Sequence, residues 1–314
     1  GQVHAPHPLG LRRYNKVRPM LGAFRKASKQ APAEHFPPPS LCRFAMPELP
    51  EVETTRRGIA PELTGLTATG AIIRNGRLRL PIPPDLDAIL AGQQLVAVER
   101  RAKYLLLRFS GGSLLVHLGM SGSLHIVPAA APPEKHDHID VVFGLRALRL
   151  RDPRRFGMVL WQAGDTPHPQ LAALGIEPLG DEFDGPWLYK ASRGRKTPVK
   201  LFIMDGTQVV GIGNIYASES LFRAGIDPTT PVGELGPRRC ARLTACIRET
   251  LQDALAAGGS TLRDFVGSNG SPGYFQQQYF AYGRDGEPCR QCGTLIRKRI
   301  MGQRATFYCP RCQR

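Results

Sequence analysis

Two adjacent residues near position 47 could carry out covalent chemistry on a sugar. Pro47 and Glu48 follow Met46, and removal of a Met before a small residue would expose the secondary amine of Pro47. Free α-amino groups titrate at about pH 7.7–8.0, so a fraction of such an amine is nucleophilic at neutral pH. Attack on a sugar C1′ would form a Schiff base, which from a secondary amine must be a cationic iminium. Glu48 could then transfer protons at the sugar ring.

The same stretch is also typical of an ordinary helix start, which is the alternative interpretation. Pro50 suits the first turn, where a missing N–H costs nothing. Glu48, Glu51 and Glu53 suit the positive end of the helix dipole. Gly58 is placed to end this helix.

Four cysteines near the C-terminus have the spacing of a metal site. Cys289 and Cys292 form one Cys-x₂-Cys pair, Cys309 and Cys312 form another, and 16 residues separate them. This spacing predicts a tetrahedral structural zinc site with no open position for catalysis, and two disulfides are the alternative. The segment between the two pairs is basic, and no acidic residue occurs from position 288 onward. Its positive side chains could bind a phosphate backbone. They are Arg297, Lys298, Arg299 and Arg304.

Composition points to a polyanionic partner. The 314 residues carry a net charge of +16 with a pI of about 10, and residues 46–314 alone hold 34 basic and 25 acidic side chains. Such an excess favours nucleic acid as the partner. The sequence contains no run of 18 apolar residues, so no membrane span is predicted. Cys42, Cys240 and Cys246 are scattered and are interpreted as free thiols; with no visible signal peptide, a cytoplasmic location is expected.

Residues 1–45 are not expected to fold. They are basic, rich in Pro and without a sustained apolar period. A mis-assigned start codon, a vector-derived or processed leader, and an organellar transit peptide are three possible origins. If the segment stays attached, the nitrogen of Pro47 is an amide and cannot attack a sugar.

The apolar pattern divides the rest of the chain into a β-rich part and a helical part. Between positions 66 and 161, short apolar runs alternate with turns, as in an antiparallel sandwich. Around 164–198 the composition shifts to Pro, Gly, Asp and Arg, which indicates a domain boundary. Helical sequence follows, including an amphipathic stretch at 238–257. We therefore predict an α+β protein of two domains.

Several motifs together resemble the bacterial formamidopyrimidine-DNA glycosylase family, which removes oxidised purines from DNA. The segment 46–54, Met-Pro-Glu-Leu-Pro-Glu-Val-Glu-Thr, is similar to the start of that family. Gly-Ile-Gly-Asn-Ile-Tyr-Ala-Ser-Glu at 211–219 is similar to its helix–two-turns–helix element. The resemblance runs from Pro47 to the C-terminus. Composition and the resemblance together divide the chain into five parts: an extension at 1–45, a catalytic β-sandwich domain with flanking helices at 46–180, a linker at 181–197, a helical domain at 198–284 and a zinc finger at 285–314.

The resemblance also implies roles for particular side chains. Pro47 would be the nucleophile, Glu48 the proton-transfer group and Lys103 a phosphate contact beside them. Residues 265–275 would close over the everted base. The side chains that fill the gap left by that base would be Met120, Arg154 and Phe156, and further phosphate contacts would be Lys200, Asn214 and Arg304.

The predicted function is base-excision repair by a glycosylase that also cleaves abasic sites. The expected partner is double-stranded DNA with oxidised bases or abasic sites, the expected cofactor is one structural zinc ion, and the resemblance suggests a monomer associated with the bacterial nucleoid. Two alternatives are open. One is an endonuclease VIII-like enzyme for oxidised pyrimidines, against which Leu49 and Val52 argue. The other is a protein that binds damaged DNA without cutting it, because Pro47 stays blocked.

Overall fold

The computed structural model describes residues 46–164, 166–259 and 279–314. All of them belong to one compact unit, Leu41–Arg314. The predictions for residues 1–45 and for the loop at 265–275 lie outside the described residues. In the described part of the chain, no helix is long and apolar enough to cross a membrane.

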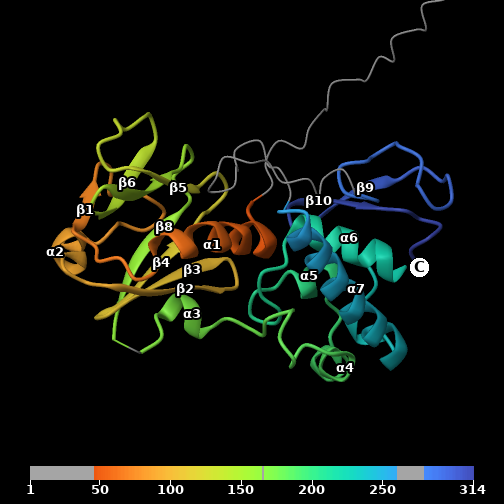
Figure 1. Ribbon diagram of the computed structural model, residues 1–314. Coiled ribbons are helices and arrows are strands. Elements are labelled where there is room, and N and C mark those ends of the chain that lie inside the picture. Colours follow the sequence, from red (N-terminus) through yellow and green to blue (C-terminus); the bar gives the residue numbers. More distant parts are fainter. Residues whose placement is uncertain (1–45, 165, 260–278) are drawn as a thin grey trace, which may run out of the picture. The chain divides into compact units, whose positions relative to one another are not determined.

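Two four-stranded antiparallel sheets face each other and form the predicted sandwich (Figure 1). Apolar side chains of both sheets meet in one core, which includes Leu105, Leu107, Val141 and Leu150. One sheet has the order β2-β3-β4-β8, with strands Leu95–Arg101, Tyr104–Phe109, Gly112–His117 and Met158–Ala163. The other has the order β1-β6-β7-β5, with strands Gly70–Ile73, Asp137–Phe143, Arg146–Arg151 and Ser123–Pro128. The short helices α2 (Leu86–Leu90) and α3 (Pro169–Ala172) flank the sandwich.

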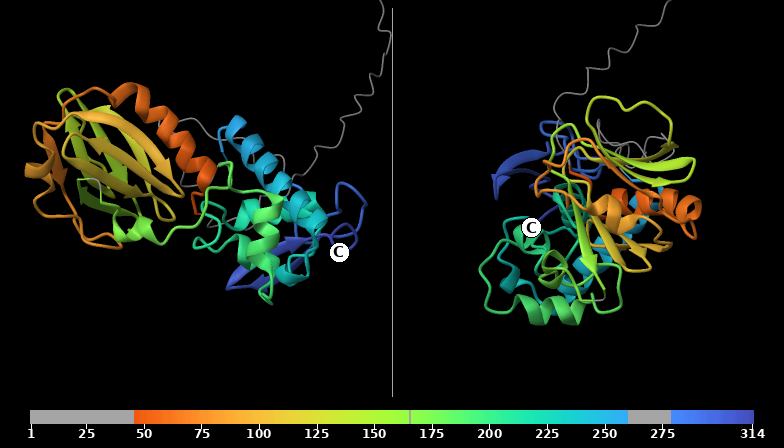
Figure 2. Two further views of the ribbon diagram at one scale, coloured as in Figure 1. Left: turned by 90° about the horizontal axis from the view of Figure 1, so that it is seen from below. Right: turned by 90° about the vertical axis from the view of Figure 1, so that its left-hand side faces the viewer.

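Helix α1 (Leu49–Leu63) joins the sandwich to the helical part of the chain. It packs against edge strands of both sheets, β2 and β5, and against α7 (Figure 2). Leu49 belongs to the helical core, whereas Val52, Ile59 and Leu63 belong to the sandwich core. The prediction that Gly58 ends this helix is wrong. The burial of Ile59 and Leu63 extends it by five residues, because that burial outweighs the cost of about 1 kcal/mol for a glycine inside a helix.

The helical part is built around α6 (Asn214–Ala224) and α7 (Pro237–Ala256), which pack on each other. Their shared core also takes side chains from α5 (Val199–Ile203), α4 (Gly185–Ser192) and the 3₁₀ helix η1 (Val232–Glu234). Helix α4 occupies the segment placed between the domains on composition. Asp184 caps it by accepting a bond from the Trp187 N–H, and Gly185 lies against Ala241 of α7, where a Cβ would clash.

A C-terminal hairpin of β9 (Arg297–Met301) and β10 (Arg304–Tyr308) completes the chain and packs on α6. Hydrogen bonds fasten its end to the turn after α6: the Gln313 amide donates to the Ile226 carbonyl, and the Arg314 N–H donates to the Gly225 carbonyl. The antiparallel sandwich, the helical domain and the terminal hairpin confirm the predicted fold class.

Candidate active site and DNA-contact surface

The carboxylate of Glu48 lies at the N-terminus of helix α6. Its two oxygens accept hydrogen bonds from the Gly213 N–H at 2.7 Å and the Ile215 N–H at 2.9 Å, with a longer bond from the Tyr216 N–H. Gly213 is required here, because a Cβ would lie 2.3 Å from the Glu48 carboxyl carbon. Free N–H groups and the helix dipole favour an anion at such a place. Burial nevertheless raises the pKa of the Glu48 carboxyl, although Lys103 and these N–H groups oppose the rise.

Pro47 is buried and directly precedes Glu48, the N-cap residue of α1. Glu51 fixes this start, since its carboxylate accepts the Glu48 N–H at 2.8 Å and the Tyr216 hydroxyl at 2.6 Å. The helix start and the catalytic arrangement are therefore compatible. The Tyr216 contact was not predicted, because it joins residues 165 positions apart.

Lys103 approaches the same place from the β2–β3 turn. Its amine donates to the carbonyl of Ile212 at 3.4 Å, one residue before Gly213. Burial lowers the pKa of Lys103; the charge of Glu48 opposes this shift, and that of Arg304 adds to it. The structure thus places Lys103 close enough to Glu48, the residue after Pro47, for their charges to interact.

Met120 and the pair Arg154 and Phe156 lie on two loops that a buried carboxylate holds together. Asp152 accepts the Ser121 hydroxyl at 2.6 Å and the Gly157 N–H at 2.8 Å, and the Ser121 oxygen accepts the Arg154 N–H. Both loops carry the chain from one sheet of the sandwich to the other.

Within these loops, the Arg154 guanidinium lies 5.0 Å from the centre of the Phe156 ring. Phe156 is 45% exposed, which is unusual for a phenylalanine. The bracing role of Asp152 was not predicted, because its partner Ser121 lies 31 positions away.

His117 is a residue near the site that the sequence analysis did not single out. Its Nδ1 accepts the Gly119 N–H at 3.0 Å, which shapes the loop that carries Met120. Burial, with the charges of Lys103 and Arg79, lowers the pKa of His117 to about 4. The imidazole is therefore neutral at physiological pH, as this acceptor role requires.

Lys200 and Asn214 connect the helical part to the terminal hairpin. The Lys200 amine is buried and donates to the Asn214 side-chain oxygen at 2.6 Å and to the Thr306 hydroxyl at 2.7 Å. The Asn214 amide donates to the Ala305 carbonyl at 2.9 Å. Lys200 and Asn214, two of the side chains predicted to contact phosphate, therefore hold β10 in place in this structure. Arg304, at the start of β10, is close enough to lower the pKa values of Lys103 and Lys200.

The burial of the Lys200 amine predicts that stability depends on pH. Burial lowers its pKa to about 7, with a smaller contribution from Arg304 and an opposing one from Glu48. The folded state then releases this proton more readily than the unfolded chain, whose lysines titrate near pH 10.4. Between about pH 7 and 10, the unfolding free energy should gain up to about 1.4 kcal/mol per pH unit relative to Lys200→Met. Urea unfolding at several pH values measures this difference. The exposed Lys190→Met is the control, and a difference that stays constant with pH would contradict the expectation.

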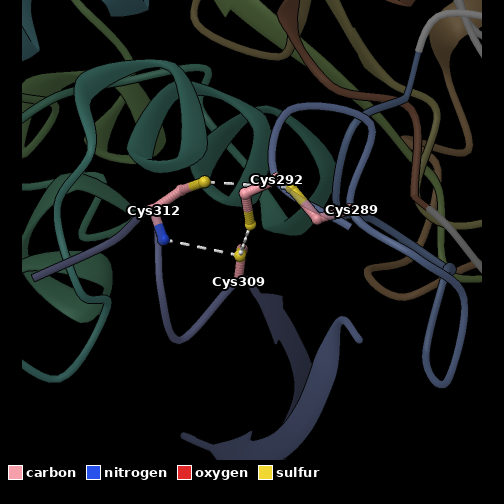
Figure 3. Close-up of side chains that lie close together, drawn as sticks. All are labelled: Cys289, Cys292, Cys309 and Cys312. Atoms are coloured by element: carbon pink, nitrogen blue, oxygen red, sulfur yellow. Dashed lines mark hydrogen bonds between the residues drawn. The ribbon is translucent and has the colours of Figure 1, made fainter. Parts of the chain in front are cut away.

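The four predicted metal ligands converge at the base of the hairpin (Figure 3). The sulfur atoms of Cys289, Cys292, Cys309 and Cys312 all lie within 4.8 Å of one another, with two separations of 3.9 and 3.5 Å. Tetrahedral zinc with Zn–S bonds of about 2.3 Å places sulfurs about 3.8 Å apart. Backbone N–H groups point at two of the sulfurs, Cys289 and Cys309, which suits thiolates. The donor set fits zinc and leaves no ligand position open.

The catalytic-type carboxylate at a helix N-terminus, the cations around it and the four-cysteine hairpin define a class. They are typical of DNA glycosylases that carry a helix–two-turns–helix element and a zinc finger. Comparisons with known families agree along most of the chain. Residues 46–159 match the formamidopyrimidine-DNA glycosylase N-terminal domain, residues 174–266 its H2TH domain, and residues 286–314 the zinc finger found in the same proteins and in isoleucyl-tRNA synthetase.

Relatives at high identity support the same assignment. A formamidopyrimidine-DNA glycosylase of Aromatoleum aromaticum is 62% identical over 270 residues, which cover 86% of this chain and all of that protein. Two solved complexes of the Lactococcus lactis enzyme are each 33% identical, cover 85% of this chain and all of theirs, and have TM-scores of 0.80 and 0.79. The first contains a variant and Fapy-dG DNA, and the second contains DNA with an oxidised pyrimidine. The chain belongs to the formamidopyrimidine-DNA glycosylase family. The predicted family and the predicted structural zinc are confirmed.

Proposed function

We propose that this chain excises oxidised purines through the amine of Pro47 and then cleaves the strand at the abasic site. Family membership makes it a DNA glycosylase of base-excision repair. The lyase step and the residue roles are our inference. The observation that carries it is the placement of Glu48: a buried carboxylate next to Pro47, held by α6 and facing Lys103.

In this mechanism the lone pair of the Pro47 nitrogen attacks C1′, and the bond to the damaged base breaks. The base leaves with the electron pair and takes up a proton. The nitrogen loses its proton, and the C1′–O4′ bond breaks with its electron pair going to the ring oxygen, which takes up a proton; this gives the cationic iminium. The iminium acidifies the C2′ proton, whose loss eliminates the 3′ phosphate, and loss of the C4′ proton then eliminates the 5′ phosphate. Burial raises the pKa of Glu48 above its ordinary value, which favours a carboxyl group that can give a proton as well as take one. The attack requires a free amine at Pro47.

Neighbouring side chains would hold the DNA around this centre. Met120, Arg154 and Phe156 occupy loops fastened to each other, and an apolar wedge with a cation can fill the gap left by a flipped base. Lys103 and Arg304 would contact phosphates near the extruded nucleotide. Lys200 and Asn214 would do so after exchanging some of their bonds to β10.

The brace between the two loops can be tested through Asp152. In Asp152→Asn, one carboxylate oxygen becomes an NH₂ group that faces an existing donor, so the loops lose a shared bond. We expect lesion excision to slow about tenfold, because misplacing a group by about 1 Å has effects of that order or larger. Affinity for undamaged duplex should change little. Single-turnover kinetics and 2-aminopurine fluorescence measure excision and base extrusion. The exposed Ser110→Ala is the control, and unchanged kinetics in Asp152→Asn would contradict the brace.

A wider lesion range is the second candidate. One of the Lactococcus lactis complexes contains an oxidised pyrimidine, so a purine preference does not follow from the family alone. Excision rates on matched duplexes carrying 8-oxoguanine or an oxidised pyrimidine decide between the two ranges.

Borohydride trapping tests the covalent step. A duplex with 8-oxoguanine opposite cytosine is mixed with the 314-residue chain and with a chain that begins at Pro47, and intact masses are recorded. Cross-linking by the Pro47 chain alone is expected. Cross-linking by both chains at unchanged mass would mean that another amine attacks. If neither cross-links while both bind the duplex, the protein binds damage without cutting.

A further inference from the structure

The β2–β3 turn that carries Lys103 has an unfavourable backbone conformation. Ala102, the residue before Lys103, has φ +56°, a region that L-residues rarely adopt and that hairpin turns usually fill with glycine. Its N–H does not bond across the hairpin; it donates to the Glu177 carboxylate at 2.6 Å. The conformation of this turn therefore depends on a residue 75 positions away.

Glu177 also binds the two arginines that lead into the turn. One oxygen accepts Arg101 at 3.0 Å, and the other accepts Arg100 at 2.9 Å. The same nitrogen of Arg100 donates to the Ala102 carbonyl at 3.0 Å, and its Nε lies 3.3 Å from the Glu53 carboxylate of α1. Arg100 and Glu177 are 13% and 24% exposed, so these bonds are partly shielded from water and gain strength from that shielding.

The residues just before Glu177 form hydrogen bonds with the segment 206–210, which is the approach to helix α6. The Gly175 N–H donates to the Gly206 carbonyl at 2.8 Å, and the Val210 N–H donates to the Ile176 carbonyl at 2.9 Å. That approach leads directly to Ile212, whose carbonyl accepts Lys103, and to Gly213, whose N–H donates to Glu48.

We propose that Glu177 is a positioning residue that sets Lys103 against Glu48, by tying the β2–β3 turn to the segment that leads into α6. Arg100 extends the same tie to α1, the helix that begins next to Pro47. Glu177 lies outside the sequence motifs that carry the family resemblance. The proposal rests on the proposed function for its kinetic effect, but its structural content is independent of it.

The kinetic test is a double-mutant cycle on the chain that begins at Pro47. Glu177→Gln keeps one acceptor oxygen but turns an NH₂ group toward an arginine. We expect the single-turnover excision rate to fall about tenfold with little change in duplex affinity. A small displacement of Lys103 slows the reaction more than it weakens binding of the duplex. In the Lys103→Ala background the same substitution should have almost no effect. An equal loss in both backgrounds, or none in either, would overturn the proposal.

A second measurement does not depend on activity. Hydrogen exchange of the Ala102 amide should be faster in Glu177→Gln than in the unchanged protein, because its acceptor is weakened. Glu99→Gln is the matched control: Glu99 lies on the same hairpin and forms an exposed pair with Arg108, and it should alter neither readout. Arg100→Lys, which cannot bridge both carboxylates, should act in the same direction as Glu177→Gln and replaces it if that variant does not fold.

The outcomes separate the two proposals. If the unchanged chain that begins at Pro47 neither excises the lesion nor cross-links to DNA with borohydride, the proposed function fails. Hydrogen exchange of the Ala102 amide still reports whether Glu177 holds the β2–β3 turn. If that chain is active while Glu177→Gln is equally active with unchanged Ala102 exchange, the positioning role is refuted.

Discussion

Replacing Glu48 by Gln is expected to lower single-turnover excision about 10²–10⁴-fold, the usual contribution of a positioned acid–base group. Gln cannot transfer a proton, but it has nearly the same shape. One oxygen remains to accept a backbone N–H of α6, whereas the new NH₂ group faces a second N–H. We therefore expect a modest loss of stability beside a large loss of rate. Affinity for a duplex with a tetrahydrofuran abasic analogue should change by less than about threefold.

The comparison that isolates chemistry from folding uses Glu62→Gln, on the exposed end of the same helix. Thermal unfolding of both variants shows whether α6 has kept its place. A Glu48→Gln protein that is folded and retains a rate within tenfold of the unchanged chain would mean that Glu48 serves only as a helix cap.

The predictions for this site came from short motifs, and the one based on cysteine spacing is confirmed. The Pro47–Glu48 pair, the cysteine spacing and the glycine-rich start of α6 each place their chemistry within a few residues. Alternating apolar runs likewise predicted the antiparallel sandwich. Strand β5 has a weaker apolar pattern, because it lies at a sheet edge and only its first two residues are buried.

Contacts between distant segments could not be predicted from the sequence. Lys200 was assigned to phosphate, and nothing in its neighbours indicates that its amine meets Thr306 106 positions away. Asp152 and Glu177 are similar cases, since their partners come from other strands and loops. Gly58 shows the opposite failure: a correct local preference was overridden by burial of the residues that follow it.

Removing zinc is expected to weaken duplex binding about a hundredfold, because the terminal hairpin carries cations that neutralise phosphates and zinc contributes much of the folding energy of such small modules. In Cys309→Ser the two cysteine pairs lose their common centre, and Arg304 loses its fixed position. The hairpin side of the Lys200 and Asn214 contacts would be lost as well.

Fluorescence anisotropy at several salt concentrations should show both a weaker Kd and a shallower salt slope. Cys246→Ala, a buried cysteine of α7 outside the cluster, should bind normally. The sandwich core contains no residue of the hairpin. The strands of the sandwich should therefore remain folded without zinc. A zinc-free protein that binds duplex with unchanged affinity and salt slope would mean that the hairpin does not contact DNA.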